Sequence, residues 1–183
     1  MPTDAERFLG HLQDVFGKED AIHSAEASDG LPPVSAFVYR NIPEAGMITG
    51  VTYGLSLCSL PAWKLARPEM IISVKSESID WPLAAATFAA AFRGKKAFSY
   101  GDVFTTDLPL ADDSKMDGFL IFAQSILDSA VETVQLANYK IHFSQFYPIY
   151  KSEVGVYESI GLKVFWHHKH FDMYDIQRRR IKA

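Results

Sequence analysis

The sequence lacks most features that mark secreted, membrane-spanning or metal-binding proteins. It has a single cysteine, Cys58, in 183 residues, and one thiol can form neither an internal disulfide nor a thiolate zinc site. Its apolar runs are too short to cross a bilayer, and its first residues carry acids instead of the apolar segment of a signal peptide. We therefore expect a soluble, cytoplasmic protein with no membrane partner.

Basic residues are outnumbered by acidic ones, 18 against 22. The formal net charge is −4, whereas nucleic-acid-binding domains usually present a basic face. The run from Arg178 to Arg180 is a weak signal on an acidic chain, and it fits the end of a helix as well as a nucleic-acid patch. We therefore expect no nucleic-acid partner.

The first half of the chain contains two helix patterns with three strand patterns between them. Thr3 and Glu6 form a capping-box pattern that begins a helix over 3–16. A polar link follows, and we expect strands over 34–40, 47–57 and 69–76. Asp80 is expected to cap a second helix in which Trp81 and Phe88 line the buried stripe.

The second half contains shorter elements. We expect a short strand over 99–106, a buried strand over 119–125 and one long strand over 134–148. Pro148 is expected to start a helix that ends at Gly161, followed by a helical segment over 162–171. Helices and strands do not alternate regularly, so the predicted fold class is α+β, a mixed sheet with helices packed on it.

Gly54-Leu55-Ser56 begins like the Gly-x-Ser-x-Gly turn of a hydrolase. That turn needs a second glycine and a following helix, but Cys58 occupies the fifth position and a strand pattern follows. We favour the interpretation that Gly54 marks a bulge or a close backbone approach within a strand.

No ligand set for a metal or cofactor is complete. The loop that starts at Asp113 resembles a calcium loop, but Lys115 and Gln124 stand where ligands are required. His167, His168 and His170 lie close together without a completing acid or thiolate. Glycine-rich phosphate motifs are missing too, so the predicted cofactors are none.

Aromatic residues make up 13% of the chain, and eight of them are tyrosines. Tyrosines beyond the needs of the core are typical of interfaces. This composition mildly favours a binding protein over an enzyme.

Five short motifs occur in a fixed order along the chain. They are TYGLS at 52–56, RPEMIISVKS at 67–76, SKMDGFLIF at 114–122, FSQFYPIYKSE at 143–153, and a closing Gly161 followed by Asp175-x-x-Arg178. This ordered set resembles the suppressor of fused family over residues 33–178.

The resemblance implies an α+β domain that binds protein and carries no catalytic residues. It places a suppressor of fused-like domain at 33–183, with 1–32 as a helix and linker of the same domain. Eukaryotic members sequester transcription factors of the Hedgehog pathway, a role not carried over because this chain lacks their second domain. Stand-alone bacterial members are proposed to be immunity proteins that neutralise toxins, and we expect that role here.

The alternative function is an enzyme with an unrecognised site, using Cys58, His142 or Glu153. For the binding function, we expect a partner segment to join an exposed strand edge, with 34–40 and 99–106 as candidates. Tyr39, Tyr100 and Phe104 would then be the aromatic anchors, unless they simply complete the core. The sequence does not predict an oligomeric state.

Overall fold

The protein is described by a computed structural model over residues 1–182, and it is an α+β fold built on one mixed sheet. The sheet has eight strands within these residues, in agreement with the predicted fold class. The strands are β1 (Ala21–Ala25), β2 (Val34–Arg40), β3 (Ile48–Tyr53), β4 (Arg67–Val74), β5 (Val103–Thr105), β6 (Gly118–Ala123), β7 (Thr133–Gln135) and β8 (Lys140–Ile149). The helices are α1 (Asp4–Phe16), α2 (Asp80–Phe92) and α3 (Val154–Trp166), with short 3-10 turns η1 (Leu55–Leu57) and η2 (Lys151–Glu153).

The strand order is β1-β2-β3-β4-β8-β6-β5, and β7 pairs with β8 beside this path. All pairs are antiparallel except β4 with β8, which are parallel. The strands at the two ends of this order are therefore β1 and β5.

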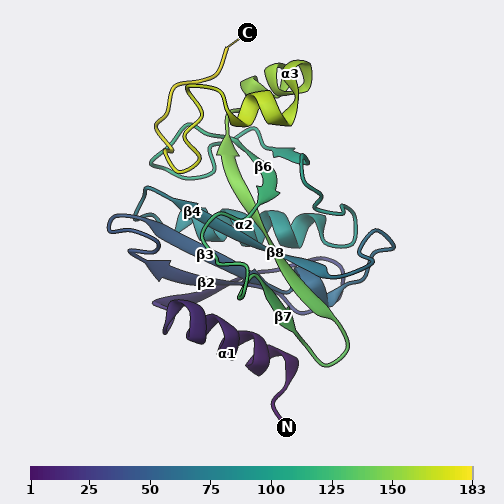
Figure 1. Cartoon of the computed structure of the whole chain (residues 1–183). Helices are drawn as coiled ribbons and strands as arrows, with labels where there is room; N and C mark the ends of the chain where they lie inside the picture. Colours follow the sequence, from purple (N-terminus) through teal and green to yellow (C-terminus); the bar gives the residue numbers. More distant parts are fainter. Residues whose placement is uncertain (183) are drawn as a thin grey trace.

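Helices cover both faces of the sheet (Figure 1). The capping box predicted for α1 is confirmed, since Thr3 and Glu6 exchange both of their hydrogen bonds. Phe8 and Leu12 of α1 are fully buried against one face, next to Phe37 of β2. The alternate residues of β2 join Trp81 of α2 in a larger core on the opposite face. This alternation is the side-chain period of a strand buried on both sides.

Helix α3 and the C-terminal segment form a third cluster at one end of the molecule (Figure 1). The expected helix start at Pro148 is wrong, because Pro148 lies inside β8 opposite Phe119 of β6. Helix α3 begins instead at Val154, and Gly161 kinks it with a φ of 77°. Residue Ile181 is buried against this cluster, which fastens the C-terminal segment to the fold.

Three expected strand and cap positions also differ. The polar link contains β1, whose alternating residues are only half-buried, so its apolar signal is weak. The expected strand 134–148 is a hairpin of β7 and β8. Helix α2 has Ile79 rather than Asp80 at its N-cap. Within residues 1–182, no helix has the length and apolar character needed to cross a membrane.

Candidate partner-binding surface

The three predicted aromatic anchors lie in different environments. Tyr39 is 1% exposed, with its ring 4.9 Å from that of Phe16 beneath α1. Phe104 is 4% exposed and stacks on Phe98 at 5.2 Å. Both rings complete the core, so neither is accessible to a partner in this structure. Tyr100 is 54% exposed and contacts the ring of Phe122 edge-on at 5.4 Å.

The two predicted edge strands also differ. Strand β2 is not an edge, because β1 pairs with it along its length from Val34 to Val38. Strand β5 is the terminal strand on its side and pairs only with β6 in the sheet order. Tyr100 precedes β5 by three residues, so an exposed aromatic ring lies in the loop that leads into the terminal strand.

Tyr100 lines a groove with a volume of about 570 Å³. Its walls are two loops, 62–66 and 97–100, and the indole Nε1 of Trp63 joins them by donating to the Ala97 carbonyl at 2.7 Å. Leu65 on the first loop is 93% exposed. An exposed leucine and an exposed tyrosine that line one groove fit a binding surface.

Residues of β8 complete the lining of this groove. His142 and Ser144 both lie there, and burial lowers the pKa of the His142 imidazole. The Ser144 hydroxyl is fully buried and has no hydrogen-bond partner among residues 1–182. Buried hydroxyls are usually paired, so this unpaired one is an exception.

The motif residues Thr52 to Ser56 and Glu69 form a buried polar network. The Glu69 carboxylate is fully buried and accepts hydrogen bonds from the Thr52 hydroxyl at 2.6 Å and the Gly54 amide at 2.8 Å. It also accepts from the amide of Ser56 at 2.9 Å and from its hydroxyl at 2.7 Å. Burial raises the pKa of Glu69, while these hydrogen bonds lower it. The network fixes the position of η1, which precedes the first groove loop in the chain.

Gly54 is required by the backbone at this point. Its φ is 134°, and an added Cβ would lie 3.0 Å from both the Pro33 oxygen and the Val34 Cα. The interpretation of Gly54 as a close backbone approach is confirmed, but Gly54 follows β3 and precedes η1 instead of lying within the expected strand. The Ser56 hydroxyl donates to Glu69 and is fully buried, so it cannot act as an exposed nucleophile.

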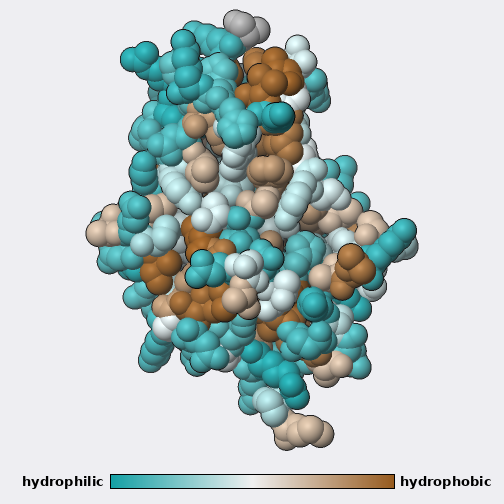
Figure 2. Space-filling view, in the orientation of Figure 1, coloured by the Kyte–Doolittle hydropathy of each residue, from teal (hydrophilic) through white to brown (hydrophobic). Residues whose placement is uncertain are grey.

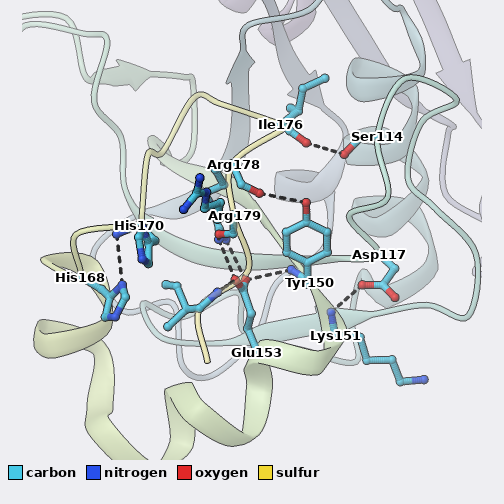
Figure 3. A network of polar contacts seen from close by, with 11 residues as sticks. Ser114, Asp117, Tyr150, Lys151, Glu153, His168, His170, Ile176, Arg178 and Arg179 are labelled. Carbon is cyan, nitrogen blue, oxygen red and sulfur yellow. Dashed lines mark hydrogen bonds and ion pairs between the residues drawn. The ribbon is translucent and has the colours of Figure 1, made fainter. Parts of the chain in front are cut away.

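The later motifs meet in a second buried network around Glu153 (Figure 3). Arg178 donates to both carboxylate oxygens of Glu153 at 2.7 Å, and the pair is almost fully buried. The amides of Ile181 and Tyr150 donate to the same carboxylate at 2.7 and 3.0 Å. Ser114 donates to the Ile176 carbonyl at 2.8 Å. The motifs therefore shape the scaffold, and the groove residues Trp63 and Leu65 lie between them without a motif of their own.

The residues considered for an enzyme do not form a site. The Glu153 carboxylate already accepts hydrogen bonds from Arg178. Burial raises the pKa of the Cys58 thiol, which disfavours the reactive thiolate. No hydrogen bond within the described residues joins Cys58, His142 and Glu153. Residues 1–182 also contain no cluster of three His, Cys, Asp or Glu side chains able to hold a metal.

The fold and the buried motif networks together define an α+β domain of the suppressor of fused type. The family model described as suppressor of fused protein (SUFU) matches residues 30–179. Because this match covers most of the sequence, the chain belongs to the suppressor of fused family. A search of curated proteins found no match.

Three solved structures share the fold. A suppressor of fused homologue from Neisseria gonorrhoeae FA 1090 matches with a TM-score of 0.74 and 19% identity, over 97% of each chain. A chain in the crystal structure of the Sufu-Fu complex matches with a TM-score of 0.66 and 13% identity, over 97% of this chain and 91% of that one. Drosophila suppressor of fused matches with a TM-score of 0.68 and 15% identity over 97% of this chain, which spans about half of that protein, 51%.

Proposed function

We propose that this chain is a non-catalytic protein-binding module that captures its partner at the Tyr100 groove and the neighbouring edge of β5. The observation that carries this proposal is the half-exposed Tyr100 beside a groove of about 570 Å³, next to the terminal strand of the sheet. Membership of a family in which one structure is that of the Sufu-Fu complex supports a protein partner.

The proposed mode of capture is addition of an extended partner segment to β5. An open strand edge offers backbone donors and acceptors, while pockets beside it select alternate side chains. An apolar side chain of the partner would enter between Leu65 and Tyr100. Backbone pairing supplies affinity, and these two side chains supply selectivity.

We further propose that the partner is a toxin and that the module acts as a cytoplasmic immunity protein. The net charge of −4 suits a basic toxin, because opposite charge accelerates encounter between the two proteins. The lone, half-buried thiol of Cys58 suits a reducing compartment. Blocking a toxin requires occlusion rather than catalysis, which fits an exposed groove without a reactive group at its centre.

The experiment is co-expression with the products of adjacent genes, pull-down, and titration of the purified partner with variants. Tyr100→Ala and Leu65→Ala should each weaken capture by more than about 1 kcal/mol, which is about fivefold in Kd. Ile22→Ala is the matched control, because Ile22 is a 48% exposed apolar residue on β1 at the opposite edge of the sheet.

The three variants should have the thermal stability of the wild type, since each side chain is largely exposed. Unchanged affinity in both groove variants would refute the Tyr100 groove as the binding surface. Weakened capture by Ile22→Ala alone would move the surface to the β1 edge. A captured partner without toxin activity would refute the immunity role while leaving the groove in place.

A further inference from the structure

A second hollow, at the opposite side of the fold from α1, is lined by positively charged and imidazole side chains alone. Its volume is about 650 Å³, and its lining residues are His168, Lys169, His170, Arg179, Arg180 and Lys182. They come from two segments, the turn after α3 and the C-terminal segment. Figure 3 shows His168 and His170 on the first segment and Arg179 on the second. Within residues 1–182, no carboxylate lines it.

The four cations of this hollow have no acidic partner among residues 1–182. The ion pairs of the described residues engage Lys75, Arg93, Lys151 and Arg178 instead. All four cations are exposed. Cations gathered without counter-charges repel one another, so an anion placed between them would relieve that repulsion.

The C-terminal cations are held in place by their buried neighbours. Arg178 is locked on Glu153, and Ile181 is 2% exposed within the third cluster. Arg179 and Lys182 each follow one of these buried residues and point outward, while Arg180 lies over the Tyr150 ring at 4.6 Å. This arrangement fixes the backbone that carries the cations, which spares an incoming anion part of the entropy cost of ordering the segment.

The two histidines of the hollow supply a hydrogen-bond donor, and the pKa of one of them indicates the sign of the local electrostatic potential. The backbone amide of His170 donates to Nδ1 of His168 at 3.2 Å, so in the neutral His168 ring Nε2 carries the hydrogen and can donate. Desolvation lowers the pKa of His170, and the positive charges of Lys169, His168 and Arg179 lower it further. The hollow is therefore a region of positive potential.

We propose that this hollow binds a free, soluble anion that carries two or more phosphate groups. A phosphate group carries a charge of about −1.5 to −2 at neutral pH, so two groups balance four cations. Arginine presents a planar fork that fits phosphate oxygens bidentately, and lysine adds a point charge. The lining residues are all of charged or imidazole types, which argues against a ligand with a large hydrophobic body.

The charge distribution of the whole chain favours a small anion over a nucleic acid or an anionic membrane. Residues 1–32 carry seven acidic and two basic side chains, whereas residues 160–183 carry six basic and two acidic ones. Helix α1 and the C-terminal segment lie at opposite ends of the molecule (Figure 1). Hydrophilic residues cover much of the C-terminal end (Figure 2). An extended polyanion would be repelled by the acidic remainder, while a small one would meet the cationic hollow alone.

The test is calorimetric titration of the untagged full chain with pyrophosphate and tripolyphosphate at constant ionic strength. Lys169→Gln/Arg179→Gln should weaken binding by at least about tenfold, because each removed cation loses a charge-assisted contact. The matched control is Lys95→Gln/Lys96→Gln, which removes two exposed charges elsewhere. Tyr100→Ala should leave anion binding unchanged, which separates this site from the proposed partner groove.

Folding of the double variant is checked by its melting temperature, which should match the wild type since neither side chain has a partner in residues 1–182. Equal affinity of all variants for tripolyphosphate, or no binding to the wild type, would overturn the proposal. Phosphatidylserine vesicles and a single-stranded oligonucleotide serve as competitors. Tighter binding of either one, lost in Lys169→Gln/Arg179→Gln, would assign the hollow to that surface and reject the small anion.

Discussion

The buried pair of Glu153 and Arg178 offers the sharpest test of how the C-terminal segment is held. Their side chains are 0% and 2% exposed, and two hydrogen bonds of 2.7 Å join them. Arg178→Met keeps most of the volume but leaves the Glu153 charge buried without its counter-ion. Removal of one partner of such a pair costs about 3–5 kcal/mol.

Glu153→Gln is the reciprocal change and leaves the Arg178 charge without its partner. It should cost a similar amount, because the guanidinium is equally buried. The double variant Glu153→Gln/Arg178→Met removes both charges together. It should cost no more than either single variant, since no uncompensated charge remains.

Urea denaturation followed by linear extrapolation measures all three free energies of unfolding. For a chain of this size, a loss of about 4 kcal/mol corresponds to a fall in Tm of about 8–16 °C. A cost below about 1 kcal/mol for Arg178→Met would show that the pair is solvated and the segment loosely held. Strict additivity of the two single variants would refute direct coupling between the charges.

The remaining predictions concern the N-terminal half. Hydrogen bonds from Arg93 lower the pKa of Asp29 to about 2, from 3.8, so this pair stabilises the fold above pH 3.8 and the stabilisation is lost as pH falls to about 2. An acid titration of the free energy of unfolding should therefore be shallower over that window in Asp29→Asn. Gly54→Ala should cost about 1–3 kcal/mol in urea, whereas Gly10→Ala, inside α1 with open space around it, should stabilise the protein. We propose that the first 32 residues belong to the same folding unit, so deletion of α1 should lower Tm sharply and not leave an intact domain.

The two proposed binding surfaces were only partly visible in the sequence. The C-terminal arginines and the three histidines are each weak signals alone, and the fold brings Arg179, Arg180, His168 and His170 to one hollow. One signal could have linked the two groups: the histidines and the arginines are only about ten residues apart in the sequence, on either side of Phe171. In addition, the buried residues Arg178 and Ile181 are each followed by an exposed cation. The Tyr100 groove had even less signal, because Leu65 lies in a loop between the family motifs.

Local chemistry explains what the sequence determined by itself. The capping box of α1 depends on two residues three positions apart, and the buried apolar runs of β2 and β4 lie within seven and eight residues. Such patterns are complete within a few residues. The family motifs are similarly compact, so fold class and family were both within reach of the sequence.

Tertiary structure alone decided which strand edges and aromatic rings are exposed. Tyr39 and Phe104 belong to strands predicted as edges, but β1 covers β2, and Phe104 faces the core from β5. Strand β1 formed from a polar link because its neighbour β2 supplied the hydrogen bonds. Edge status and burial depend on partners far along the chain, such as Glu69 with Ser56 or Arg178 with Glu153. No local pattern identifies those partners, because a strand has the same sequence pattern whether or not another strand pairs with it.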